Sequence, residues 1–384
     1  MVNYMKQLKY IILYVGLLAI SACTAEKVAP TAETVQNTEV RLVADISESG
    51  NASRADADYI KRAFTDGDQI RLVNTVFYNT PNFNDKKTIF TFSNEYDPVK
   101  GYKFTQSSQT GQGNSDNDTE NTEDGVEQTQ SVLTWNDFSP TSFVYIFEAV
   151  YYPGNKLFNS VDIDQNANDG IGFKNSDLLL AHHRMLLEDK YNDIELSFHH
   201  ALAMVRVNVS VPIGVGGLQK DAFTEACVHG VQPGFTVNYS STISNDGLRT
   251  VYGTGEKNDI TMWRQSSKVS SDNKTQTYTF LAIIPVPNVD DGEKIDQEDF
   301  VRFKVKIDND IEKIYRFVRN EGAGAISLSQ SHITVLNLKW DVNEGLPLLL
   351  SASIEPWKEA YADMILDGED SNSNENNQEG GSNP

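Results

Sequence analysis

Alternation of apolar and polar side chains is the feature that most restricts how this chain folds. It is clearest in "FVRFKVKI", residues 300–307, where the odd positions are apolar and Arg302, Lys304 and Lys306 are basic. A period of two indicates a strand with one buried face. No segment keeps a helical period, and "SDLLLAHHRMLLED", residues 176–189, is the nearest helical candidate. The sequence therefore predicts an all-β fold, with further strands expected at 39–46, 69–78, 142–153, 194–211, 276–287, 313–318 and 333–340.

The chain is too long for a single ordinary core. It has 384 residues, of which 39% are hydrophobic, with 18 Phe and 16 Tyr to fill an interior. Chains of this length usually divide into two domains. We place the boundary near Asn192, which predicts two tandem β-sandwich domains over residues 39–192 and 193–366.

The charge balance excludes one large class of partner. Acidic residues number 54 and basic residues 32, giving a formal net charge of −22 at pH 7. Such a surface repels phosphate backbones and anionic lipid headgroups, so we expect no nucleic-acid partner. Any membrane attachment then has to be covalent or inserted.

The N-terminus has the pattern of an export signal. Lys6 and Lys9 precede ten apolar residues, which are too few to span a bilayer. The following "AISAC" resembles the lipobox of bacterial lipoproteins, which predicts a signal peptide over residues 1–22 and a lipid on Cys23. An ordinary secretion signal is the alternative. Cys227 is the only other cysteine, so no intramolecular disulfide is expected after lipidation.

Three segments have compositions that do not support a packed core. Residues 23–38 are polar and serve as a spacer, and residues 106–131 form an acidic, low-complexity loop within the first domain. Residues 367–384 form an acidic tail without apolar residues, which we expect to be disordered.

Two adjacent histidines interrupt the longest alternating segment. His200 shares a face with the apolar even positions before it, so we expect it to be buried and hydrogen-bonded, with His199 on the opposite face. After it the apolar positions become odd, which predicts either a β-bulge near Ala203 or a strand that passes from one sheet to another. His182 and His183 leave open a composite zinc site with this pair.

Other chemistry is weakly indicated. Cys227 and His229 share a strand face without an evident third group, so a free, buried cysteine is the preferred interpretation. The segment "DIDQNANDG", residues 162–170, places oxygen ligands at alternate positions but departs from the EF-hand pattern, and a polar turn is favoured over a calcium loop. We expect no catalytic residues, no metal and no cofactor.

Several segments, taken in order, resemble the fimbrillin family, the type V pilins of Gram-negative anaerobes. The resemblance covers most of residues 40–357. Its central piece is a "DLLLA" segment followed by "F-x-H-x-L-A" and a valine-rich strand. The matching segments are "ASRADADYIKRAFTDGDQIRL", "LLLAHHRMLLEDKYNDIELSFHHALAMVRVNV", "FLAIIPVP", "ITVLNLKWD" and "ASIEPW".

The resemblance implies a fold and a mode of assembly. Members are lipoproteins with two transthyretin-like β-sandwich domains, whose first strand is removed by an arginine-specific protease and replaced by a strand from the next subunit. In this sequence the resemblance implies cleavage between Arg54 and Ala55. The donor strand would lie in the C-terminal alternation, at Tyr361, Ala362, Met364 and Leu366, with residues 348–354 as a further candidate.

The expected function is therefore that of a non-enzymatic pilus subunit or accessory protein that mediates adhesion at the outer membrane and in the fimbria. Its partners would be other pilus subunits, the membrane through its lipid, and a host or glycan ligand. The alternative is a cell-surface glycan-binding lipoprotein, in which Trp135 or Trp263 stacks on sugars.

Overall fold

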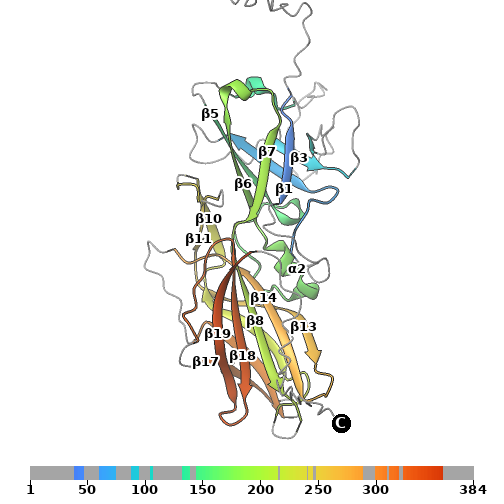
Figure 1. The fold of residues 1–384 in the computed structure, drawn as a ribbon, viewed down its shortest axis with the longest axis vertical. Coiled ribbons are helices and arrows are strands. Elements are labelled where there is room, and N and C mark those ends of the chain that lie inside the picture. The colour runs from blue at the N-terminus through green and yellow to red at the C-terminus, as the bar shows by residue number, and fades with distance from the viewer. Residues whose placement is uncertain are drawn as a thin grey trace, which may run out of the picture. The chain divides into compact units, whose positions relative to one another are not determined.

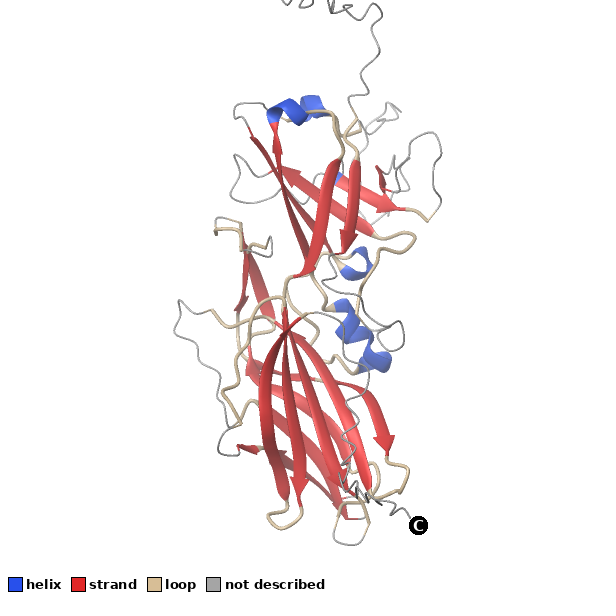
Figure 2. Ribbon diagram, viewed as in Figure 1, coloured by secondary structure: helices blue, strands red, loops and turns tan. Residues whose placement is uncertain are grey.

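Nearly all regular structure in the chain is strand, as the alternation predicts (Figure 2). The computed structural model describes residues 39–46, 60–74, 88–94, 104–106, 132–138, 144–214, 217–239, 241–244, 248–288, 299–308, 311–319 and 323–357. The all-β fold class is confirmed.

The first seven strands form one closed sheet. Its order is β1-β4-β3-β2-β5-β6-β7, and β1 closes it by pairing with β7 (Figure 1). The two layers expected of the first sandwich are thus joined at both edges. The strands are β1 Leu42–Ile46, β2 Gln69–Asn74, β3 Ile89–Phe92, β4 Phe104–Gln106, β5 Val144–Tyr151, β6 Leu179–Leu186 and β7 Ile194–His200.

Aromatic side chains fill the closed sheet. Phe64 makes edge-to-face contacts with Phe104, Tyr151 and Phe198 at ring-centroid distances of 5.2–5.7 Å. Trp135, on the 3₁₀ turn Trp135–Asp137, is fully buried against Phe147 and its neighbours. Edge-to-face packing is the favoured geometry for aromatic rings, so this core is both apolar and geometrically specific.

The rest of the chain forms a sandwich of a six-stranded and a four-stranded sheet. The orders are β13-β14-β8-β18-β19-β17 and β12-β9-β15-β16, and β10 and β11 form a separate two-stranded sheet. The strands are β8 Ala203–Pro212, β9 Phe223–Val231, β10 Gly234–Asn238, β11 Thr250–Thr254, β12 Asn258–Thr261, β13 Trp263–Val269, β14 Thr275–Ile284, β15 Val301–Asp308, β16 Ile311–Arg316, β17 Val318–Arg319, β18 His332–Asp341 and β19 Leu346–Pro356.

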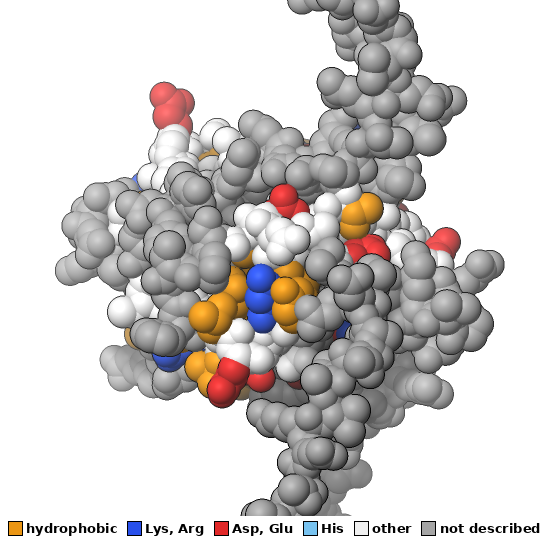
Figure 3. Space-filling view, turned by 90° about the horizontal axis from the view of Figure 1, so that it is seen from above, with side chains coloured by type: hydrophobic (Ala, Val, Ile, Leu, Met, Phe, Trp, Pro, Cys, Tyr) orange, Lys and Arg blue, Asp and Glu red, His pale blue; other side chains and the backbone are white. Residues whose placement is uncertain are grey.

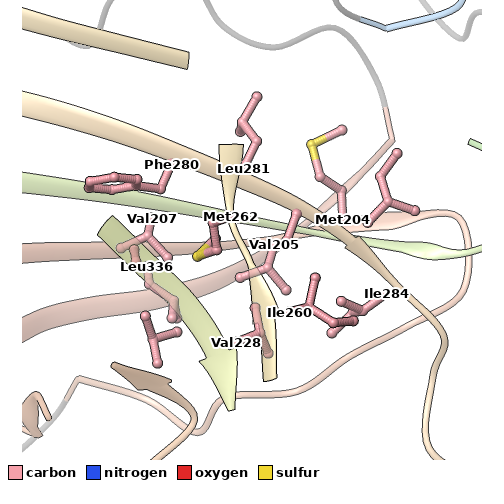
Figure 4. Close-up of a cluster of buried hydrophobic side chains, with 14 of the residues drawn as sticks. Met204, Val205, Val207, Val228, Ile260, Met262, Phe280, Leu281, Ile284 and Leu336 are labelled. Atoms are coloured by element: carbon pink, nitrogen blue, oxygen red, sulfur yellow. The ribbon is translucent and has the colours of Figure 1, made fainter. Parts of the chain in front are cut away.

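The core of this sandwich comes from the alternating positions of its strands (Figure 4). Figure 4 shows Val205 of β8 beside Val228 of β9 and Ile260 of β12, and Val207 of β8 beside Leu336 of β18. The segment "FVRFKVKI" behaves as predicted, because its apolar residues Val301, Phe303 and Val305 are fully buried in β15.

The segment with the adjacent histidines changes sheets. β7 ends at His200 and lies in the closed sheet, whereas β8 begins at Ala203 and lies in the six-stranded sheet. The change of apolar phase is therefore a passage between sheets, the second of the two expected explanations. β7 pairs with β6 and β1, so the chain passes from the first sheet to the six-stranded sheet at residues 201–202, after the Asn192 near which the domain boundary is predicted. The wider division of the chain into domains stays a prediction.

The segment named as the nearest helical candidate is a strand. Residues 179–186 form β6, which pairs with β5 along its whole length and with β7 at Leu179, Leu180 and Ala181. Pairing on both sides overrides the local preference of a leucine-rich sequence for helix. The one α-helix in the described residues is α2, Ala167–Asn175, which begins within residues 162–170, the segment considered as a calcium loop.

The start of α2 is unusual. Asn168, Asp169 and Gly170 all have positive φ, at 48°, 56° and 82°. A Cβ atom on Gly170 would lie 2.5 Å from the indole ring of Trp263. Glycine is thus required at this position by both its backbone conformation and the close approach of β13.

We predict that Gly170→Ala destabilises the fold more than Gly154→Ala. Both glycines have positive φ, but a Cβ atom on Gly154 would meet no other atom within 4 Å. Steric overlap should therefore add about 1–3 kcal/mol to the cost at Gly170 alone. Urea unfolding of the two variants measures the difference, and equal free energies of unfolding would contradict the packing described here.

Candidate functional site

β1 is the candidate functional element, because it joins β7 to β4 in the closed first sheet and is paired along its length on one side only. It runs parallel to β7 with five paired positions, from Leu42 with Ile194 to Ile46 with Phe198. On its other side it pairs with β4 only at Leu42 and Phe104. Figure 1 shows β1 beside β7. β1 is therefore held mainly by one neighbour.

The buried face of β1 contributes strongly to the first core. Val40, Leu42 and Ile46 are buried, Ala44 packs against the same core, and Val43 is 49% exposed. Burial of three such side chains contributes on the order of 5–9 kcal/mol, which is comparable to the stability of an ordinary domain. Removing β1 without a replacement would therefore leave an apolar slot and two unpaired strand edges.

The C-terminal end of β7 is covered by Trp357, the last residue that the structure describes. His200 is buried, and its Nδ1 lies 2.6 Å from Oδ1 of Asp177. The ring of Trp357, which directly follows β19, stacks on the imidazole at a centroid distance of 4.4 Å and an angle of 3°. The prediction that His200 is buried and hydrogen-bonded is confirmed.

The four histidines considered for zinc have separate surroundings. His182 contacts the buried carboxylate of Glu148, with Nδ1 3.2 Å from Oε1. Arg249 donates to the same oxygen from Nε at 2.8 Å. The negative charge of Glu148 is therefore paired with the positive charge of Arg249. Burial lowers the pKa of His183. Among the described residues no group of three or more His, Cys, Asp or Glu side chains is placed to hold a metal ion.

The pair Cys227 and His229 has a third group that the sequence did not reveal. Asp259 of β12 places Oδ1 2.5 Å from His229 Nδ1. The sequence separates Asp259 from this pair by about thirty residues, and only the pairing of β12 with β9 brings it close. A cysteine, a histidine and a carboxylate in this order resemble a catalytic triad, in which the carboxylate orients a histidine base that activates a cysteine nucleophile.

The remaining contacts of His229 do not fit that chemistry. Arg302 donates from Nη2 to His229 Nε2 at 2.7 Å, which occupies the nitrogen that a base would use. Asp299 accepts from Arg302 at 2.6 Å and from Arg316 at 3.0 Å, and the hydrogen bond from Arg302 is the main cause of its lowered pKa. Burial, with Asp259 nearby, raises the pKa of Cys227 to about 11. The network is an ion-pair cluster on the outer face of the four-stranded sheet.

The segment considered for calcium is used by the fold. Asn166 accepts a hydrogen bond from the backbone of Arg264 at 3.0 Å, and Asp162 accepts from the backbone of Asp164 at 3.3 Å. The neighbouring Gln165 is fully buried and bonds both backbone groups of Ile283. These contacts attach the segment to β14, as a polar turn would.

The tryptophans named for glycan binding are buried. Trp135 is 0% and Trp263 is 8% exposed, so neither presents a face to a sugar. Figure 3 shows hydrophobic, basic and acidic side chains mixed on the described part of one face. No helix in the described residues is long and apolar enough to cross a membrane.

The processing and donor residues predicted from the sequence are outside the described residues. They are Cys23, Arg54, Ala55, Tyr361, Ala362, Met364 and Leu366, together with the loop after Gln106. Residues 348–354, the further donor candidate, lie in β19 and pair with β18.

The family follows from comparison with known proteins. The fimbrillin-like family model matches residues 54–357, which is most of the chain, and the chain belongs to this family. The resemblance read from the sequence is confirmed. Membership gives the chain a fimbria-related role in adhesion at the cell surface. A comparison with curated proteins finds no match.

Among solved structures, the chain matches two that are described as candidate cell adhesion proteins. The one from Bacteroides uniformis is 14% identical with a TM-score of 0.46, covering 83% of this chain and 98% of that chain. The one from Bacteroides ovatus is 13% identical with a TM-score of 0.46, covering 84% and 99%. The fimbrial anchor protein Mfa2 from Porphyromonas gingivalis is 7% identical with a TM-score of 0.31, covering 83% and 97%.

We predict that the thiol of Cys227 is unreactive in the folded protein. With a pKa of about 11 so little thiolate is present at pH 8 that alkylation should be roughly a hundredfold slower than in the denatured chain. The rate should rise with pH until about pH 11. A Cys23→Ser chain makes Cys227 the single thiol, and alkylation at neutral pH as fast as in urea would indicate an activated cysteine instead.

Proposed function

We propose that this protein is a fimbrial subunit that assembles by strand exchange, with β1 as the strand that is replaced. The observation that carries the proposal is that β1 joins β7 to β4 in the closed first sheet and is held mainly by its pairing with β7. Once such a strand leaves, the open edge and its apolar slot bind another strand of the same pattern. A head-to-tail contact of this kind builds a filament.

Maturation at Arg54 would free β1. Arg54 follows β1 in the chain and precedes Ile60, where the described structure resumes. The match to the fimbrillin-like family begins at residue 54, so β1 lies outside the part of the chain that the family model covers. Cleavage between Arg54 and Ala55 would leave β1 attached only by non-covalent contacts.

The donor strand is the C-terminal segment that contains Tyr361, Ala362, Met364 and Leu366. Its even positions are apolar, which matches the alternation of β1. Residues 348–354 are less suitable, because β19 pairs with β18 at ten positions and would have to leave its own sheet. The donor is therefore assigned to residues after Trp357.

The attachment and partners follow from the same proposal. A lipid on Cys23 would hold the precursor at the outer membrane until β1 is cut away, and the partners would be other pilus subunits. The protein would act without catalysis, by assembly and adhesion. No described residue favours the glycan-binding alternative, because the tryptophans that motivated it are buried.

The first test is the N-terminus of the protein recovered from fimbriae. We predict that the subunit begins at Ala55 and migrates as a ladder of polymers that resists mild denaturation. Arg54→Ala should retain β1 and abolish the ladder, and Arg54→Lys should do the same if the protease is specific for arginine. An Arg54→Ala protein that still loses β1 and forms the ladder would contradict cleavage at this site.

The second test separates the donor segment from the acidic tail. Deletion of residues 358–384 should remove the polymer, because no strand then fills the slot of the next subunit. Deletion of residues 367–384 is the matched control and should leave the ladder unchanged. Electrophoresis of unheated samples measures both, and a polymer that survives the longer deletion would contradict the assignment of the donor.

A further inference from the structure

The middle of the six-stranded sheet contains no acidic residue. Residues 277–281 of β14, 206–210 of β8, 335–339 of β18 and 351–353 of β19 lie side by side there, and none is Asp or Glu (Figure 1). The whole chain has 54 acidic and 32 basic residues. A strongly acidic protein repels anionic groups over most of its surface, so a face without carboxylates is where such a group can approach.

Arg206 lies at the centre of the outer face of this sheet. It pairs with Leu281 of β14 on one side and Val335 of β18 on the other. Its neighbours along β8, Val205 and Val207, belong to the buried core. Because side chains alternate along a strand, Arg206 points to the outer face. Only 7% of the residue is exposed, so the guanidinium is nearly buried there.

The guanidinium of Arg206 has no partner within the described part of the chain. Its Nη2 atom is buried without a hydrogen bond, and no ion pair joins Arg206 to another described residue. Arg249, which is also largely buried, pairs with Glu148 at 2.8 Å. A buried charge without a partner is costly, and proteins normally pair it. Arg206 is therefore the described cation that most needs a partner from outside the sheet.

A row of hydrogen-bonded polar side chains crosses the sheet next to Arg206. Asn208, two positions along β8, accepts from Thr279 Oγ1 at 3.2 Å and donates to Asn337 Oδ1 at 2.9 Å. Asn337 in turn donates to Ser351 Oγ at 3.0 Å. Each amide nitrogen carries two hydrogens and uses one in this row, so both amides keep an N–H for a further acceptor. Asn208 and Asn337 are partly exposed, so an acceptor can reach them.

A second cation lies beyond this row on the same face. Lys339 is exposed and pairs in the sheet with Ser210, four residues after Arg206 on β8. No ion pair joins Lys339 to another described residue. Four residues of a strand span about 13 Å. An extended peptide that lies along β8 presents side chains four residues apart at the same spacing, so two of its carboxylates can meet the two cations.

We infer that Arg206 is the centre of a carboxylate-binding site on the outer face of the six-stranded sheet, and that its ligand is an extended acidic segment of a partner protein. Arg206 binds one carboxylate through two N–H···O bonds, beside the amides of Asn208 and Asn337. Lys339 binds a second carboxylate of the same segment. A carboxylate carries one negative charge, which neutralises the one buried cation.

The site is independent of the proposed strand exchange. β8, β14, β18 and β19 belong to the six-stranded sheet, whereas β1 belongs to the first sheet. A subunit that retains β1 would present the same outer face. The experiment below therefore tests the carboxylate site alone, and its failure would leave the proposed function unchanged.

The experiment measures binding of hexaglutamate to the full chain by titration calorimetry, with hexaglutamine as the uncharged probe. Arg206→Met removes the cation and keeps a long side chain. Arg184→Met is the matched control, because Arg184 is an exposed arginine of β6 in the first sheet. Hexaglutamate should bind and hexaglutamine should not. Arg206→Met should weaken binding about tenfold or more, and Arg184→Met less than about twofold.

The melting midpoint of the free protein provides a second readout. Arg206→Met should melt at the same temperature as the unaltered chain or higher, because it removes a buried charge that lacks a partner. A clear fall in the midpoint would overturn the unpaired state of Arg206. A residue that only supported the fold would lower the midpoint when replaced, so this readout separates a binding role from a structural one.

Asn208→Asp tests the site with Arg206 still in place. The new carboxylate lies two positions from Arg206 on the same face of β8, about 7 Å along the strand, and can pair with the guanidinium from within the protein. It should raise the melting midpoint and weaken hexaglutamate binding about tenfold. Unchanged binding in this variant would overturn the inference even if Arg206→Met fails to fold.

Three further outcomes identify the ligand. Equal weakening in Arg206→Met and Arg184→Met would overturn the site in favour of an effect of overall charge. Sulfate that binds as tightly as hexaglutamate at equal ionic strength would overturn the acidic segment as the ligand. Hexaglutamate that binds only after deletion of residues 367–384 would overturn the partner protein as the source, because the acidic tail of the same chain would then compete for Arg206.

Discussion

The parallel pairing of β1 with β7 is the contact on which the first sheet depends. It joins the edges of an otherwise open sheet and buries Leu42 and Ile46 at its two ends. A single short strand that closes a sheet and is held mainly on one side is easily exchanged once the chain is cut, since only its own contacts retain it. The same feature that completes the fold of the monomer would thus allow subunits to be joined.

The polar clusters that suggested chemistry stabilise the fold. His229 has the oriented carboxylate that a catalytic base needs, yet Arg302 occupies its other nitrogen and Cys227 has a raised pKa. His200, the last residue of β7, contacts Asp177 through Nδ1 and stacks on the ring of Trp357, which attaches the last described residue of the chain to the first sheet. The buried His200 thus connects β7 with the end of β19, which is distant in the sequence.

Much of the fold was predictable because burial imposes a period of two on each strand. The alternation of "FVRFKVKI" and of residues 39–46 identified β15 and β1, and the change of phase after His200 identified a passage between sheets. The local pattern could not show that β7 belongs to the first sheet or that residues 179–186 form β6, because partner strands, which no local pattern encodes, decide both. Asp259 was missed for the same reason. The family resemblance was recognised from the order of several sequence segments. It identified the first strand and the C-terminal tail as the exchanged strands, but it did not predict which strands they pair with.

A density map of the native fimbria that resolves the strand beside β7 tests strand exchange most directly. Exchange at β1 predicts that the strand in that position is residues 358–366, donated by the neighbouring subunit. A fimbria in which Leu42 of the same chain still lies opposite Ile194, as it does in the monomer, would contradict strand exchange at β1 and require a different contact between subunits.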